Sequence, residues 1–160
     1  MTMRDARGWL LAGAMTMFGC TPAVAAAPDA EPGHPLAAQV ERCFELRESR
    51  PAEAIAIAHA ALSGTDLPAP EEIKLQTCLA RASALTGDAL TAIDAVDRVE
   101  ILLTASPQSP EFALRALSNA GAALHLAGDV PRALALYTRA FEAAEAGDSD
   151  IAQIKMLNNV

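Results

Sequence analysis

Apolar residues recur at the three- and four-residue intervals of amphipathic helices from Leu36 to Val160. Proline-containing segments at 64–70 and 106–110 interrupt this pattern and predict loops. The predicted helices span residues 36–48, 51–62, 71–86, 88–104, two segments within 114–148, and 150–160. We therefore expect an all-α fold in which consecutive helices pair as hairpins.

The segment 114–148 gives the clearest signal, because it reads as a helix, a Gly-Asp break and a second helix. Gly128 suits the left-handed backbone conformation that often ends a helix. Asp129 can accept a hydrogen bond from the first turn of the next helix. We therefore expect two antiparallel helices that meet at this break.

The same segment resembles the tetratricopeptide repeat (TPR) family in the order of its small and large residues. The positions that carry the resemblance are Gly121, Leu124, Gly128, Ala133, Tyr137 and Ala140. Leu117 departs from the family pattern, since a large aromatic residue usually stands there. The resemblance implies a right-handed solenoid of helical hairpins, in which each hairpin covers the apolar side of its predecessor.

Weaker copies of the pattern lie on both sides of this segment. The breaks at Ser49-Arg50, Gly87-Asp88 and Gly128-Asp129 recur at intervals of roughly 40 residues, longer than the TPR period of roughly 34. An alanine follows each break at the same offset: Ala54, Ala92 and Ala133. We expect a repeat domain over 36–160 with about three hairpins and a fourth that is cut off, as in long-period TPR regions. The alternative for the last helix is a lone terminal cap.

The first 25 residues read as an export signal. Arg4 and Arg7 precede an apolar segment at 9–18, and the small residues at 23–25 offer a cleavage site. This arrangement is typical of a secreted bacterial protein. We therefore expect residues 1–25 to be removed during export.

The signal is followed by a flexible leader at 26–35, whose three prolines cannot hold a helix. Cys20 ends a segment, 17–20, that resembles a bacterial lipobox, and this resemblance implies lipidation of Cys20 as the alternative form of processing. We expect a periplasmic protein or, as the alternative, a lipid-anchored envelope protein. No apolar run reaches the roughly 20 residues that a membrane helix needs, so any other membrane attachment would require a further C-terminal segment.

The composition narrows the classes of function. Hydrophobic residues make up 52% of the chain and aromatic residues 4%, which favours closely packed helices over sheets. The formal net charge of −8 argues against a nucleic-acid partner. His34, His59 and His125 lie far apart, and no glycine-rich phosphate loop is present. We therefore expect no metal, no cofactor and no catalytic activity within these residues.

Cys43 and Cys78 fall in the first helices of the first two repeats, which would be neighbours in a solenoid. An exported protein meets an oxidising compartment, where a disulfide between them can form. Cysteine is also a common small apolar core residue, so two unlinked thiols are the alternative. Both interpretations stand at this point.

Polar residues that share the inner face of the repeats form the candidate binding site. They are Lys74, Arg81, Arg115, Asn119, His125, Lys155 and Asn159. Three cations, Lys74, Arg115 and Lys155, occupy the same repeat position, and in an acidic protein such a row suggests a site for carboxylates. The resemblance implies that this face is a concave groove that binds peptides. The alternative is that these cations are solvent-exposed and serve solubility.

Together these features predict a non-catalytic module that binds a protein or peptide in the bacterial cell envelope. One alternative is the extracytoplasmic sensory part of a longer membrane-anchored signalling enzyme, of the diguanylate cyclase or histidine kinase type. Another is a structural scaffold in an envelope assembly.

Overall fold

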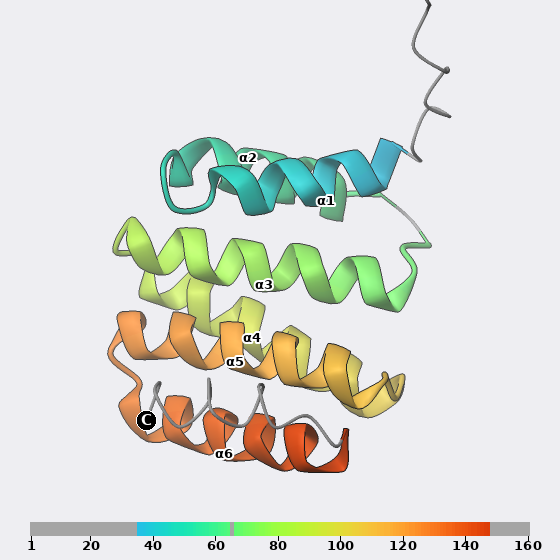
Figure 1. The fold of residues 1–160 in the computed structure, drawn as a ribbon. Coiled ribbons are helices and arrows are strands. Elements are labelled where there is room, and N and C mark those ends of the chain that lie inside the picture. The colour runs from blue at the N-terminus through green and yellow to red at the C-terminus, as the bar shows by residue number, and fades with distance from the viewer. Residues whose placement is uncertain (1–34, 65, 148–160) are drawn as a thin grey trace, which may run out of the picture. The chain divides into compact units, whose positions relative to one another are not determined.

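The computed structural model describes residues 35–64 and 66–147, which form six α-helices and no strand (Figure 1). The helices are α1 (Pro35–Leu46), α2 (Pro51–Leu62), α3 (Ala69–Leu85), α4 (Ala89–Ala105), α5 (Pro110–Ala127) and α6 (Val130–Ala146). The all-α prediction is therefore confirmed for this part of the chain. The predicted signal peptide, the leader up to residue 34 and the helix from residue 150 lie outside the described residues, as do Cys20, Lys155 and Asn159.

Local sequence signals set the helix boundaries. Side-chain caps occur at Asp88 of α4, Ser109 of α5 and Asp129 of α6, which accept hydrogen bonds from the backbone N–H three residues later at 3.1, 3.3 and 3.3 Å. Gly87 and Gly128 adopt φ angles of 82° and 89°, which a residue with a Cβ rarely does. The Gly-Asp breaks therefore define the turns between α3 and α4 and between α5 and α6.

Consecutive helices pack against each other, and each hairpin also contacts the next. Contacts join α1 to α2, α3 to α4 and α5 to α6 within hairpins, and α2 to α3 and α4 to α5 between them. The first helices of the hairpins also meet, α1 with α3 and α3 with α5, and Figure 1 shows these three helices following one another. The in-phase alanines, Ala54, Ala92 and Ala133, are all buried in the core.

Helices α5 and α6 approach closely at Gly121. A Cβ atom added there would lie 2.9 Å from Cε1 of Tyr137 and 3.3 Å from the carbonyl oxygen of Ala133. Tyr137 lies against Gly121, and both Leu124 and Tyr137 are buried. The two helices predicted on either side of the Gly128-Asp129 break are thus in close contact.

Candidate ligand-binding pocket

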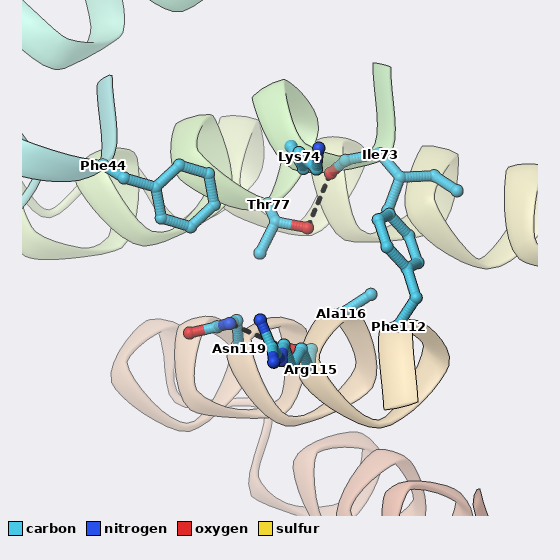
Figure 2. A pocket seen from close by; sticks show the side chains of 8 residues that line it. All are labelled: Phe44, Ile73, Lys74, Thr77, Phe112, Arg115, Ala116 and Asn119. Carbon is cyan, nitrogen blue, oxygen red and sulfur yellow. Dashed lines mark hydrogen bonds between the residues drawn. The ribbon is translucent and has the colours of Figure 1, made fainter. Parts of the chain in front are cut away.

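A pocket of about 240 Å³ opens between α1, α3 and α5 (Figure 2). Its lining residues are Phe44 of α1, then Ile73, Lys74 and Thr77 of α3, and Phe112, Arg115, Ala116 and Asn119 of α5. Three of them, Lys74, Arg115 and Asn119, are polar residues that the sequence predicted to share one face. The structure therefore brings these three together.

The helix starts explain this convergence. Lys74 lies five residues after the first residue of α3 and Arg115 five residues after the first residue of α5, since 74 − 69 and 115 − 110 are both 5. The two residues thus have the same phase on helices that pack against each other. Between them, Thr77 is buried and its hydroxyl donates a hydrogen bond to the Ile73 carbonyl oxygen at 2.7 Å. The polar side chains therefore surround an apolar surface.

Two phenylalanine rings form walls of the pocket. Figure 2 shows Phe44 and Phe112 on opposite sides of it, contributed by α1 and α5. Only six aromatic residues occur in the whole chain, so two in one pocket give it much of the aromatic surface available. Their rings can pack against an apolar group of a ligand, while the cations between them contact an anionic group.

Each cation of the pocket also has a carboxylate one helical turn earlier. The Lys74 ammonium lies 3.6 Å from Glu71, and Arg115 forms an ion pair with Glu111. The Lys74 nitrogen also lies 5.9 Å from the centre of the Phe112 ring. Exposed ion pairs of this kind contribute at most about 1 kcal/mol. An incoming carboxylate can therefore compete with these internal partners.

Asn119 adds a neutral donor to the site. Its side-chain N–H donates to the Arg115 carbonyl oxygen at 2.8 Å. An amide carries two N–H donors, and in the described part of the chain this is the only hydrogen bond of the Asn119 side chain. The second N–H can donate to a ligand.

Arg81 and His125 do not line the pocket. Arg81 of α3 forms a two-point ion pair with Glu48, which follows α1, through Nε at 2.9 Å and Nη2 at 3.3 Å. His125 is exposed in the last turn of α5. Of the predicted inner-face residues that the structure describes, these two therefore stand outside the pocket.

Arg47 was not singled out in the sequence, yet it adjoins the pocket. Its guanidinium carbon lies 4.6 Å from the centre of the Phe44 ring. Burial lowers the pKa of Arg47 below its ordinary value; the nearby Glu48 carboxylate raises this pKa, and the Arg81 cation lowers it further. The repeat pattern gave no signal here, because the two corresponding positions are held by Leu85 and Leu126.

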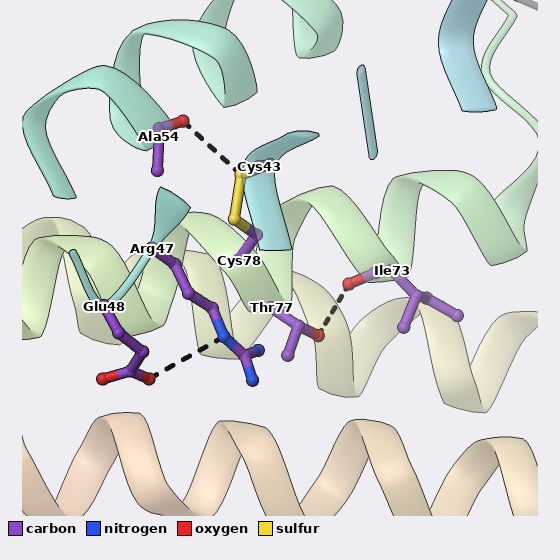
Figure 3. Close-up of a disulfide and its surroundings, with 7 residues drawn as sticks. All are labelled: Cys43, Arg47, Glu48, Ala54, Ile73, Thr77 and Cys78. Carbon is purple, nitrogen blue, oxygen red and sulfur yellow. Dashed lines mark hydrogen bonds and ion pairs between the residues drawn. A yellow bond between two sulfur atoms is a disulfide. The ribbon is translucent and has the colours of Figure 1, made fainter. Parts of the chain in front are cut away.

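Cys43 and Cys78 form a disulfide that joins α1 to α3 (Figure 3). Their Cα atoms are 6.2 Å apart, both residues are fully buried, and the Cys43 sulfur lies 3.5 Å from the Ala54 carbonyl oxygen. Of the two alternatives left open by the sequence, the structure contains the bridge. Phe44 follows one cysteine and Thr77 precedes the other, so the cross-link adjoins the pocket wall.

Other kinds of site have no support in residues 35–64 and 66–147. No group of three or more His, Cys, Asp or Glu side chains is placed there to hold a metal ion. No helix in these ranges is long and apolar enough to cross a bilayer. Comparisons with protein-family models, with curated proteins and with solved structures found no match.

Proposed function

We propose that this chain is a non-catalytic, TPR-like module that binds a carboxylate-bearing peptide segment of a partner protein. The observation that carries the proposal is the meeting of Lys74, Arg115 and Asn119 in one pocket between two phenylalanine rings. The repeat positions and the family resemblance predict that the same three residues share the inner face of the repeats. Their convergence therefore supports a groove formed by the repeats.

The packing of the helices supports the TPR-like interpretation. In a solenoid of hairpins the first helices of neighbouring repeats contact one another and line the inner face. Here α3 contacts both α1 and α5, and the pocket lies along these three helices. The buried alanines at equivalent positions fit the same repeat unit. We infer a right-handed arrangement from the family resemblance.

The size of the pocket favours a peptide side chain over a drug-sized small molecule. Pockets that enclose drug-sized ligands measure roughly 300–1,000 Å³, whereas this one measures about 240 Å³. It suits a single apolar side chain placed between Phe44 and Phe112, with a neighbouring carboxylate accepting hydrogen bonds from Lys74, Arg115 and Asn119. Extended peptides bind in grooves through such side-chain anchors.

The disulfide supports an exported location. Disulfides persist in oxidising compartments and are rare in the bacterial cytosol. The Cys43–Cys78 bridge, together with the predicted signal at 1–25, supports a periplasmic protein. Trapping of free thiols on protein isolated from the periplasm would test this: we expect neither Cys43 nor Cys78 to react, and labelling of both would contradict it.

A peptide panel tests the function. The probes are dansyl-labelled hexapeptides with one phenylalanine and two glutamates in an alanine background, in every order, alongside glutamine counterparts. We expect the wild-type protein to bind acidic members, and Lys74→Glu with Arg115→Glu to weaken binding at least about 100-fold, because two charge-assisted contacts are lost. Fluorescence anisotropy measures the affinities, and circular dichroism verifies that helicity is retained.

A matched control changes the net charge equally at residues that do not line the pocket. Arg42 of α1 and Arg98 of α4 form surface ion pairs and do not line the pocket. The variant with both changed to Glu should bind the acidic probes within a factor of about three of wild type, since long-range charge effects are screened by salt. Equal loss in both double variants, or no binding of any acidic probe, would reject the proposed function.

A further inference from the structure

Arg47 holds a buried nitrogen that has no partner. Its Nη1 is shielded from solvent and makes no hydrogen bond within the described part of the chain. The nearest carboxylate belongs to Glu48, whose oxygen lies 3.8 Å from Nε, too far for a hydrogen bond. An unpaired buried donor on a charged group destabilises a fold, and such groups are found where they serve another purpose. The interactions within the described part of the chain therefore leave the Arg47 cation incompletely satisfied.

The charges around Arg47 do not balance. Glu48 is engaged by Arg81, which donates to both of its carboxylate oxygens. Two guanidinium groups thus share one carboxylate, and this leaves a local surplus of one positive charge. A further carboxylate beside the Arg47 side chain, which is 21% exposed, would remove the surplus.

This cation adjoins the pocket through a shared ring. Arg47 lies over Phe44, with 4.6 Å between the guanidinium carbon and the ring centre, and Phe44 is a wall of the pocket. Figure 3 shows the side chain of Arg47, the residue that follows α1, in front of α3, with Glu48 beside it. A peptide seated in the pocket would therefore reach Arg47 if it continued past Phe44.

We propose that Arg47, with Arg81 beside it, is a second anion-binding subsite and that the bound peptide carries two carboxylates. One carboxylate contacts Lys74, Arg115 and Asn119, and the other forms an ion pair with the Arg47 guanidinium. This inference rests on the proposed function and specifies its ligand as an acidic pair of residues near an apolar side chain.

The test compares Arg47→Gln, Arg47→Lys and the surface control Arg42→Gln. The probes are the tightest dansyl hexapeptide of the panel and its two versions in which one glutamate is replaced by glutamine. With the two-glutamate probe we expect Arg47→Gln to weaken binding about tenfold, Arg47→Lys to weaken it less, and Arg42→Gln to have no effect. With one of the two single-glutamate probes, Arg47→Gln should change the affinity less than twofold, because the contact it removes is already absent.

Thermal unfolding separates a ligand contact from a structural role. Because Nη1 is unpaired in the fold, Arg47→Gln should leave the midpoint unchanged or raise it. If the variant lowers the midpoint and weakens all probes equally, Arg47 is structural and the second subsite is wrong. If it weakens none of them while the change at Lys74 and Arg115 abolishes binding, the second subsite is wrong and the proposed function stands. If the wild-type protein binds no probe, both the second subsite and the proposed function are wrong.

Discussion

Replacing Gly121 by alanine sets two opposing effects against each other in the contact between α5 and α6. Alanine stabilises a helix interior by roughly 0.5–1 kcal/mol relative to glycine, because glycine loses more backbone entropy on folding. Against this, the new Cβ would lie 2.9 and 3.0 Å from two ring atoms of Tyr137 and 3.3 Å from the Ala133 carbonyl oxygen. The Tyr137 ring is buried and cannot swing into solvent, so the helices must separate slightly.

We expect the cost of the steric clash to exceed the gain in helix propensity. Added methyl groups in well-packed cores cost typically 1–3 kcal/mol, so Gly121→Ala should lower the free energy of unfolding by about 1 kcal/mol after the gain in helix propensity. This corresponds to a fall of roughly 4 °C in the thermal midpoint of a domain of this size. Urea unfolding followed by circular dichroism at 222 nm measures the change. Gly121→Val should cost about 3 kcal/mol or more, since a branched side chain meets the same atoms.

A neighbouring residue provides the control. Ala122→Gly in the same turn of α5 measures the propensity difference locally, and we expect it to destabilise by about 0.5–1 kcal/mol. If Gly121→Ala stabilises the protein by the amount that Ala122→Gly costs, no clash exists. Tyr137 would then not lie against Gly121, and the close α5–α6 contact would be refuted.

Three other predictions concern the two glutamates that pair with the pocket cations, the disulfide and a helix cap. Changing Glu71 and Glu111 to Gln should tighten binding of the acidic dansyl probes about threefold, because competing carboxylates are removed, and unchanged or weaker binding would contradict this. Reduction of the disulfide, whose cysteines are 35 residues apart, should lower the free energy of unfolding by about 3.8 kcal/mol on the loop-entropy relation; urea midpoints in the oxidised and reduced states that coincide would refute it. Hydrogen bonds from Thr91, through its side chain and then its backbone N–H, lower the pKa of Asp88. The stabilisation is therefore present above the ordinary Asp pKa of about 3.9 and is lost as the pH falls through the lower folded value, so Asp88→Asn should flatten the acid limb of stability against pH; parallel curves for both proteins would count against it.

The helices and their ends were predictable from the sequence because their signals are local. Gly128 followed by Asp129 specifies a left-handed residue and a cap whatever surrounds them, and both occur as expected. The helix boundaries differ from the predictions by a few residues at most; α3, for example, begins at Ala69 instead of Glu71. Frayed ends depend on weak differences that a residue pattern does not resolve.

The pocket was predictable only in part. Lys74 and Arg115 were found because their equivalent repeat positions place them on one face. Arg47, Phe44 and Phe112 have no equivalent residues in the other repeats, so the repeat pattern carried no signal for them. Phe44 and Phe112 each stand three residues before an arginine, Arg47 and Arg115, and this spacing is the sequence signal that marks them. The unpaired nitrogen of Arg47 is a property of tertiary packing and appears only in three dimensions.

The Cys43–Cys78 bridge also decides how the chain responds to force. When the ends of the domain are pulled apart, tension passes directly through the bridge, and the loop between the cysteines, which includes all of α2, bears none of it. The bridge therefore keeps the 35-residue loop from extending, which corresponds to about 12 nm of contour length at roughly 3.5 Å per extended residue. Helices α4, α5 and α6 lie outside the loop and bear the full tension. In optical tweezers, the oxidised protein should therefore extend about 12 nm less than the reduced one.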